Sequence, residues 1–415
     1  MGIVVDICKR AAETSGAVAS LNTATKDGAL SAMADALLEN AAPLVAANSE
    51  DVERARSEGT SNTIVDRLTL TDARLGSMAD GLRAVAAQPD PVGEVLQGWK
   101  RPNGLLIEKV RVPLGVVAVI YEARPNVTAD VAGLCLKSGN ACILRGSSIA
   151  LSSNKAIVEV LQRAAIDAGV PEAAIQLIPD ASRESAVELM QAKGLVDLLV
   201  PRGGKALIQS IEEQATVPYI IDGDGNCHVF VDRSADPKMA TDIVVNAKTQ
   251  RPSVCNAAET LLVHAEIVDK WLPTTLDALD AKGVEIRGDE RVRDLWSKAQ
   301  PATEEDWGTE YLDLIMAVRI VDSLDDAIAH VNRWGTSNAE AIVAQDITAA
   351  RRFAHEVDSG SIFVNASTRF SDGGEFGYGA EIGISTQKLH ARGPMGLREL
   401  TTAKYVVWGE GQVRT

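Results

Sequence analysis

The sequence has 415 residues, with 41 Lys and Arg against 57 Asp and Glu, so its formal net charge is −16. Hydrophobic residues make up 46% and charged residues 24%, which is typical of a globular protein and excludes a largely disordered chain. The net acidity argues against a general nucleic-acid binder, which needs a basic surface to replace counterions. At about 100–200 residues per domain, the length predicts two or three domains.

No segment predicts a targeting or membrane function. The first six residues contain no basic stretch, and no run of about 18 apolar residues occurs in the sequence. The 5 cysteines do not make a disulfide framework, and no Cys-x-x-Cys pair is available for zinc. We therefore expect a cytoplasmic protein without a metal and without a nucleic-acid or membrane partner.

The first part of the chain is expected to be helical. Residues 2–58 are rich in Ala and acidic residues, apolar positions recur near every 3.6 residues, and Pro43 is expected to kink or end one helix. From residue 113, short apolar runs alternate with helical patterns, which is typical of parallel strands covered on both faces. The predicted strands of this region are 114–120, 141–144, 174–178, 195–200, 217–221 and 227–231. This alternation predicts an α/β doubly wound fold, in which dinucleotides bind at the carboxyl ends of the strands.

A second α/β region is expected from about residue 236. Its predicted strands are 259–263, 314–320, 341–344 and 361–364, and its predicted helices lie near 236–249, 267–280, 323–333 and 347–357. The glycine-rich residues 371–396 are expected to form a long functional loop. Residues 99–112 predict a β-ribbon, and the apolar tail from Thr401 predicts a strand that must pair to avoid aggregation. Pairing with another subunit and pairing within the same chain both stay open.

Five thiols compete for the part of a nucleophile. Three of them lie in apolar segments and are expected to be buried: Cys8, Cys135 and Cys142. Cys227 precedes His228, but neighbours in a strand point to opposite faces, so this pair is not expected to act on one atom. Cys255 lies in a polar turn, Thr-Gln-Arg-Pro-Ser-Val-Cys-Asn, where Lys248 and Arg251 could favour the thiolate. Cys255 is therefore the preferred nucleophile.

Long motifs occur in order along nearly the whole chain. They are residues 112–128 (Val-Pro-Leu-Gly-Val-Val-Ala-Val-Ile-Tyr-Glu-Ala-Arg-Pro-Asn-Val-Thr), 144–148, 200–205, 222–232, 249–256, 363–370 and 379–396. Together they resemble the aldehyde dehydrogenase superfamily, and most closely its branch of γ-glutamyl phosphate reductases, or glutamate-5-semialdehyde dehydrogenases. The resemblance implies an α/β fold with a Rossmann-type cofactor domain, a second α/β catalytic domain and a β-arm for oligomerisation.

The resemblance also implies how the chain is divided. The expected parts are an NADP-binding domain (1–98 and 113–232), a catalytic domain (233–384), a return to the cofactor domain (385–400) and two oligomerisation arms (99–112 and 401–415). A homodimer or homotetramer is expected. The resemblance further suggests the upstream glutamate 5-kinase as a candidate partner.

Roles of single residues follow from the resemblance. Cys255 stands at the nucleophile, and Asn126 stands at the Asn whose amide, with the Cys255 N–H, holds the oxyanion that thiolate attack creates. Glu310 matches a Glu that holds the nicotinamide ribose. Gly203 and Gly204 match small residues at a helix start, where backbone N–H groups approach a pyrophosphate.

One departure from the family concerns the cofactor. Arg145-Gly-Ser-Ser occupies the place where many members have Lys-Pro-Ser-Glu beside the adenosine ribose. A Glu there would repel a 2′-phosphate, whereas Arg145, Ser147 and Ser148 are expected to accept one, so we predict NADP(H). A surface role for Arg145 stays open as the alternative.

A second departure concerns the reaction. Hydrolytic members use the Glu of a Glu-Leu-Gly-Gly segment to activate water, and the equivalent residues 222–228 contain no Glu. A thioester on Cys255 would then survive to meet phosphate or hydride. The implied reaction is NADPH-dependent reduction of γ-glutamyl 5-phosphate to glutamate 5-semialdehyde in proline biosynthesis. The alternatives are an oxidative aldehyde dehydrogenase, CoA-acylating or hydrolytic, and a non-catalytic scaffold. The residues expected to bind the substrate are Arg124 for the phosphate, and Ser367, Thr368 and Arg369 for the glutamyl carboxylate.

Overall fold

The computed structural model describes residues 2–414, which form two compact units. Unit 1 comprises the chain up to Ile221, Gly377–Gly383 and the residues from Met395 onward, and unit 2 comprises Asp222–Phe376 and Ile384–Pro394. This division differs from the expected one: residues 222–232 and 385–394 belong to unit 2, and residues 377–383 belong to unit 1. For residues 222–232 the reason is that the strand β7 (Cys227–Val231) pairs with strands of unit 2 on both of its sides.

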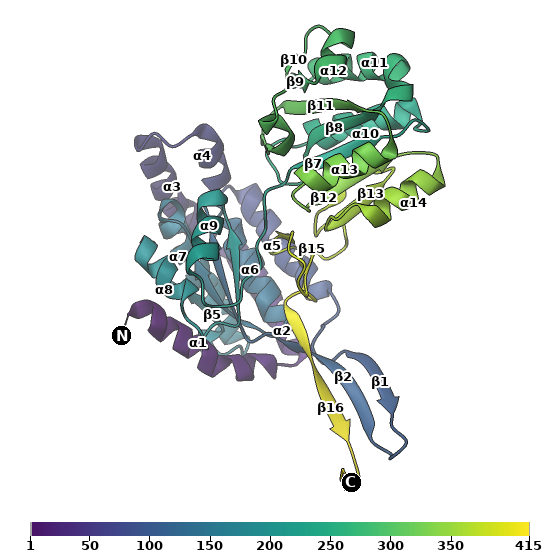
Figure 1. Ribbon diagram of the computed structural model, residues 1–415. Coiled ribbons are helices and arrows are strands. Elements are labelled where there is room, and N and C mark those ends of the chain that lie inside the picture. Colours follow the sequence, from purple (N-terminus) through teal and green to yellow (C-terminus); the bar gives the residue numbers. More distant parts are fainter. Residues whose placement is uncertain (1, 415) are drawn as a thin grey trace. The chain divides into compact units, whose positions relative to one another are not determined.

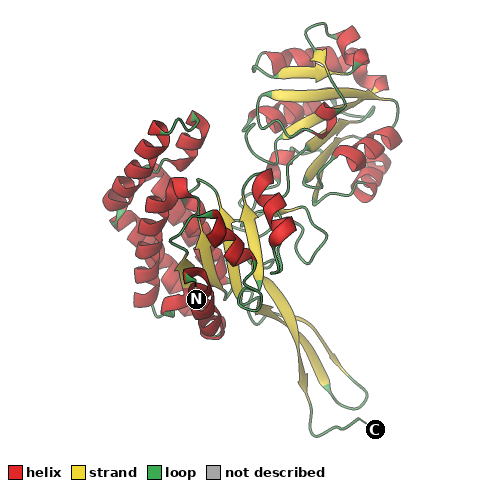
Figure 2. Ribbon diagram, turned by 60° about the vertical axis from the view of Figure 1, so that its left-hand side comes forward, coloured by secondary structure: helices red, strands yellow, loops and turns green. Residues whose placement is uncertain are grey.

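Unit 1 contains a four-stranded parallel sheet with helices on both faces (Figures 1 and 2). The strand order is β5-β4-β3-β6, with β3 at Val116–Tyr121, β4 at Ala141–Arg145, β5 at Ile175–Leu177 and β6 at Leu198–Arg202. The helices are α1 Ile3–Ala19, α2 Thr23–Glu39, α3 Ala41–Ser57, α4 Asn62–Leu68, α5 Asp72–Ala87, α6 Asn126–Lys137, α7 Leu151–Asp167, α8 Arg183–Met190 and α9 Lys205–Gln214. Alternate β3 side chains, such as Val116 and Ala118, pack in one apolar cluster with residues of α1, α8 and α9. The period-2 alternation of a strand explains why consecutive apolar residues serve both faces.

A three-stranded antiparallel ribbon extends from the sheet of unit 1 (Figure 1). It consists of β1 (Val95–Lys100), β2 (Leu106–Pro113) and β16 (Thr401–Trp408), in the order β1-β2-β16. The tail strand pairs with β2 from Thr401–Pro113 to Trp408–Leu106, so the structure shows pairing within the same chain. That this ribbon takes part in oligomer formation stays a prediction.

Unit 2 is a seven-stranded parallel sheet in the order β10-β9-β11-β8-β7-β12-β13. The further strands are β8 Ala258–His264, β9 Glu285–Gly288, β10 Gln300–Pro301, β11 Ile315–Val321, β12 Ala339–Val343 and β13 Ser361–Val364. The helices are α10 Pro237–Thr249, α11 Val268–Asp280, α12 Glu290–Leu295, α13 Leu324–Trp334 and α14 Ile347–Glu356. Val229 and Val231 of β7 pack with residues of α10–α12, and Phe230 packs with residues of α13 and α14. Adjacent residues of one strand therefore serve two cores.

Most of the predicted strands and helices form, but one predicted strand is wrong and several short strands were missed. The predicted strand 217–221 makes only an isolated bridge between Tyr219 and Leu199, because Pro218 has no N–H to extend the ladder. The strands β9 and β10 were not predicted. The glycine-rich segment 371–396 is a loop that contains the short strands β14 (Ile384–Ser385) and β15 (Gly393–Pro394). No helix among residues 2–414 is long and apolar enough to cross a membrane.

Candidate active site

Cys255 lies in the loop between α10 and β8 of unit 2, before a central strand of the sheet. It is half-buried, whereas the other cysteines are buried: Cys8, Cys135, Cys142 and Cys227. Burial raises the pKa of Cys8 to about 11 and also raises the pKa of Cys227. Because the thiolate is the reactive form, buried thiols are poor nucleophiles. Cys255 is the cysteine that combines partial exposure with a loop position.

Gly225 brings the backbone of Cys255 and the side chain of Glu310 together. A Cβ at Gly225 would lie 1.7 Å from the Cys255 carbonyl oxygen, so the two segments approach more closely than any other residue would allow. The Gly225 N–H donates to Glu310 Oε1 at 2.7 Å, and the Cys227 thiol donates to the Cys255 carbonyl oxygen at 3.2 Å. The next residue, Asn226, is buried, and its Nδ2 donates to the carbonyl oxygens of Trp307, in a 3-10 helix, and of Trp334, the last residue of α13. All these contacts precede strands, so this part of the site lies at the amino-terminal edge of the sheet.

The ammonium group of Lys248 is committed to a buried carboxylate. It is fully buried and bonds to Glu259, which is also fully buried and which accepts the Leu312 N–H at 3.1 Å. Burial lowers the pKa of Lys248 and raises the pKa of Glu259 to about 7. The expectation that Lys248 favours the Cys255 thiolate is therefore wrong, because its charge is offset by Glu259.

The loop after β13 places Arg369 within electrostatic reach of the Cys255 thiol. Its Nε donates to Gln250 Oε1 at 2.9 Å, and burial lowers the pKa of its guanidinium. Thr368 is fully buried, and its hydroxyl donates to the Asn256 carbonyl oxygen at 2.7 Å, while Ser367 is buried as well. Of these predicted substrate residues, Arg369 interacts electrostatically with Cys255, and Thr368 holds the residue that follows Cys255.

In unit 1, the expected cofactor residues and Asn126, the expected oxyanion residue, lie at the carboxyl ends of neighbouring parallel strands. Arg145 is the last residue of β4, Gly203 and Gly204 follow β6 and precede α9, and Asn126 begins α6 after β3. Because β4, β3 and β6 are adjacent and parallel, these ends share one edge of the sheet.

The side chain of Arg145 is partly engaged by the backbone. Its Nη2 donates to the carbonyl oxygens of Ala181 and Ser182 at 2.8 and 2.6 Å, and burial lowers the pKa of the group. Its Nε and the Ser147 hydroxyl are buried without a partner among the described residues. Ser148 is exposed at the start of a 3-10 helix (Ser148–Ala150).

Arg54 is a cation beside this segment that the sequence did not indicate. Its Nη2 donates to the carbonyl oxygens of Ser148 and Ile149, both at 3.3 Å, and it pairs with the buried Asp51. Asp51 in turn accepts the N–H groups of residues 152 and 153 at the start of α7. Because Arg54 lies on α3, about 90 residues earlier in the chain, no local pattern connects it to this segment.

Polar partners of Asn126 and Gly204 were also missed. Asn126 Nδ2 donates to Asp130 Oδ2 at 3.0 Å, and burial raises the pKa of Asp130 to about 6. The spacing of four residues on a helix would have indicated this pair. Glu122 Oε1 accepts the Gly204 N–H at 2.8 Å, so a carboxylate lies at the start of α9.

Arg124, expected to meet the phosphate, lies in the turn between β3 and α6, where its backbone N–H donates to the Glu122 carbonyl oxygen.

Comparison with known proteins gives the family. A family model described as the aldehyde dehydrogenase family matches residues 4–293 and 307–406. The chain belongs to the aldehyde dehydrogenase family. Two similar relatives in this family are both named gamma-glutamyl phosphate reductase. The one from Thermobifida fusca is 57% identical over 408 residues, and the one from Caldanaerobacter subterraneus subsp. tengcongensis is 55% identical over 406 residues, each covering 98% of both chains.

Solved structures agree with this aldehyde dehydrogenase fold. The crystal structure of gamma-glutamyl phosphate reductase from Thermotoga maritima has a TM-score of 0.97 and 46% sequence identity, covering 100% of both chains. An acetylating aldehyde dehydrogenase from Geobacillus thermoglucosidasius has a TM-score of 0.70 at 18% identity, covers 99% of this chain and 97% of its own, and so shows similarity of fold alone. The predicted resemblance and fold class are confirmed. Among residues 2–414 of the present chain, no group of three or more His, Cys, Asp or Glu side chains could hold a metal ion.

Proposed function

We propose that this aldehyde dehydrogenase family member is a γ-glutamyl phosphate reductase. It reduces γ-glutamyl 5-phosphate to glutamate 5-semialdehyde with NADPH and releases phosphate, as a step of proline biosynthesis. The observation that carries the proposal is the placement of Cys255, a half-buried residue whose backbone contacts Gly225. The segment that contains Gly225, residues 222–228, has no Glu. The full-length similarity to relatives named for this activity supports it.

The first proposed step is attack of the Cys255 thiolate on the acyl carbon. A carbon–sulfur bond forms, the carbon–oxygen bond to phosphorus breaks, and phosphate leaves with the bonding electrons. The carbonyl oxygen carries negative charge during attack, and we assign its stabilisation to the Asn126 amide and the Cys255 N–H. Because residues 222–228 offer no Glu to activate water, the thioester persists.

NADPH, when bound, supplies the hydride that brings the thioester to the oxidation level of the aldehyde. The residues of unit 1 fit this cofactor. A Cβ at Gly203 would lie 2.9 Å from Leu207 Cδ2 and 3.0 Å from Glu122 Cγ, so glycine keeps the start of α9 accessible. The partnerless Arg145 Nε and Ser147 hydroxyl are donors that a 2′-phosphate would satisfy. A diphosphate at Gly204 would have to replace the Glu122 carboxylate.

The last proposed step returns Cys255 to its starting form. The carbon–sulfur bond breaks, the oxygen re-forms the carbonyl double bond, and the thiolate leaves. The positive charge of Arg369 within electrostatic reach of Cys255 favours this thiolate. We also assign Arg369 to the glutamyl carboxylate and Arg124 to the phosphate, because a guanidinium binds either group with two parallel hydrogen bonds.

Assembly and location are part of the same proposal. Tyr405, Val407 and Trp408 of β16 are more than half exposed, at 61%, 53% and 58%, which is typical of a surface covered in an oligomer. We propose a homodimer or homotetramer formed through the ribbon, acting in the cytoplasm. The upstream glutamate 5-kinase is the proposed partner, because it would supply the labile acyl phosphate.

The reverse reaction tests the proposed function. Glutamate 5-semialdehyde and NADP are mixed with the protein, with and without phosphate, and NADPH absorbance is followed. We expect steady turnover only with phosphate, and none for Cys255→Ser. Steady oxidation without phosphate would favour a hydrolytic aldehyde dehydrogenase, and turnover that requires CoA would favour the acylating type. No turnover under any condition would favour a non-catalytic scaffold.

A further inference from the structure

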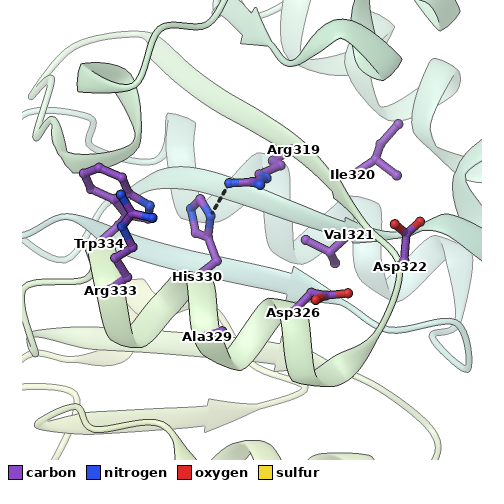
Figure 3. A pocket seen from close by; sticks show the side chains of 9 residues that line it. All are labelled: Arg319, Ile320, Val321, Asp322, Asp326, Ala329, His330, Arg333 and Trp334. Carbon is purple, nitrogen blue, oxygen red and sulfur yellow. Dashed lines mark hydrogen bonds between the residues drawn. The ribbon is translucent and has the colours of Figure 1, made fainter.

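A second polar pocket lies between β11 and α13, within unit 2 (Figure 3). Its volume is about 320 Å³, which suits a small molecule. The lining residues are Arg319, Ile320, Val321, Asp322, Asp326, Ala329, His330, Arg333 and Trp334. The proposed reaction uses none of them.

Arg319 is the cation of this pocket with hydrogen-bonding capacity to spare. It is half-buried on a strand flanked by β8 and β9, and no carboxylate of the described residues forms an ion pair with it. Its Nη1 lies 3.2 Å from His330 Nδ1, and its guanidinium lies 5.6 Å from the centre of the Trp307 ring. An arginine can only donate, so His330 accepts. Burial lowers the pKa of His330 to about 2, so this histidine is neutral and adds no competing charge. The remaining guanidinium donors suit a carboxylate.

The other end of the pocket is acidic. Asp322 and Asp326 line it, and Figure 3 shows both beyond Val321, on the side away from Trp334. Asp322 forms an ion pair with Arg291 at 2.9 Å, so Asp326 is the lining carboxylate that no cation of the described residues pairs with. Asp326 lies on the first turn of α13, and its Oδ2 accepts the Ser323 hydroxyl at 2.8 Å. A second pocket cation, Arg333, is engaged with Glu304 at 3.1 Å. The pocket therefore offers one uncommitted positive charge at Arg319, one carboxylate without a paired cation at Asp326, and an apolar wall.

We propose that this pocket binds a small α-amino acid in its zwitterionic form. The carboxylate pairs with Arg319, the ammonium group lies at Asp326, and an apolar side chain packs on Val321. A simple anion would leave Asp326 without a counter-charge, and a simple cation would leave Arg319 without one. Only a molecule that carries both charges, a few bonds apart, satisfies both ends.

The pocket is connected by hydrogen bonds to the loop of the candidate active site. The Trp334 carbonyl oxygen accepts from Asn226 Nδ2 at 2.9 Å, and the Asn226 N–H donates to Thr336 Oγ1 at 3.0 Å. Asn226 is adjacent to Gly225, which contacts the Cys255 backbone. The proposed ligand thus lies against a wall that supports this loop, without occupying the place of the substrate.

Calorimetric titration of the full-length protein tests the proposal. The probes are L-valine, L-leucine and L-proline, followed by isobutylamine and isovalerate, which are L-valine without its carboxylate and without its ammonium group. We expect at least one amino acid to bind, and each single-charge analogue to bind at least about tenfold more weakly than L-valine or not at all. Arg319→Met should abolish binding. Lys238→Gln, which removes an exposed cation on α10, should leave it unchanged.

A second variant keeps the test decisive if Arg319→Met does not fold. Asp326 lies at the surface, so its replacement is not expected to disturb folding. Asp326→Asn should weaken binding of L-valine, so that its affinity falls close to the affinity of isovalerate for the wild type. The proposal is overturned if none of the three amino acids binds, or if both variants bind as the wild type does. Equal binding of isovalerate and L-valine to the wild type would also overturn it, because the pocket would then recognise an anion alone.

Discussion

Replacing Gly225 with alanine is expected to displace Cys255 and to remove activity. The new Cβ would lie 1.7 Å from the Cys255 carbonyl oxygen, 2.4 Å from its carbonyl carbon and 2.5 Å from its Cα, whereas ordinary contacts begin at 3.4 Å. All three atoms belong to the backbone, so the two segments must separate by more than about 1 Å. Overpacking of this kind costs about 1–3 kcal/mol. A misplacement of about 1 Å at a reacting group lowers the rate by about 100-fold.

Three readouts check this reasoning. They are phosphate-dependent NADPH formation from the semialdehyde, the rate at which iodoacetamide alkylates Cys255, and the free energy of unfolding in urea. Gly76→Ala on α5 is the matched control, because a Cβ there meets nothing within 4 Å. It should keep full activity and stabilise the protein by about 0.5–1 kcal/mol. Wild-type activity and stability in Gly225→Ala would refute the account of how the loop is held.

Three further perturbations have defined outcomes. Burial raises the pKa of Asp130 from 3.8 to about 6, so its contribution to stability is present below pH 3.8 and is lost as the pH rises through 6. Asp130→Asn should therefore have the same free energy of unfolding as the wild type at pH 3.8 or below, and a free energy of unfolding larger by about 3 kcal/mol at pH 8, measured in urea titrations. Lys248→Met leaves Glu259 buried without its partner and should lower the free energy of unfolding by about 3–5 kcal/mol, most of which Lys248→Met/Glu259→Met should recover. Tyr405→Ser/Val407→Ser should convert the proposed oligomer to monomers in light scattering.

Each of these perturbations has a result that would contradict it. A stability gain in Asp130→Asn that does not vary with pH would mean that ionisation of this carboxyl is not what costs stability. Equal destabilisation by the single and double Lys248 variants would show that the loss comes from packing. Ile347→Ser, at a residue that is 61% exposed on α14, controls for the loss of any surface apolar residue. If Ile347→Ser lowered the mass measured by light scattering as much as Tyr405→Ser/Val407→Ser does, the ribbon would have no specific role in assembly.

The fold could be predicted where pattern and pairing agree. The strand Ser361–Val364 forms as its apolar run predicts, and the helices near 237–249 and 268–280 follow the 3.6-residue period. The strand β9 was missed because Glu285 and Arg287 alternate with its apolar residues, as in a solvated loop. Residues 227–231 were predicted correctly as a strand, but assigned to the wrong unit. Their apolar run does not say which strands they pair with.

The candidate site could be predicted only in part, since long-range contacts decide it. The choice of Cys255 rested on a local turn and on the resemblance, and its exposure relative to the other cysteines agrees with it. The part given to Lys248 failed because its partner, Glu259, lies on the following strand. Glu122 and Arg54 were missed because each meets its partner across a distance of 82 or more residues in sequence. No motif encodes such contacts.

A thioester on Cys255 that waits for phosphate is directly observable in a rapid-mixing experiment. The protein is mixed rapidly with glutamate 5-semialdehyde and NADP in the absence of phosphate, and NADPH absorbance is recorded. We expect a single burst of NADPH equal to the concentration of Cys255, followed by no turnover until phosphate is added. Steady NADPH formation without phosphate, or a burst that persists in Cys255→Ser, would contradict it.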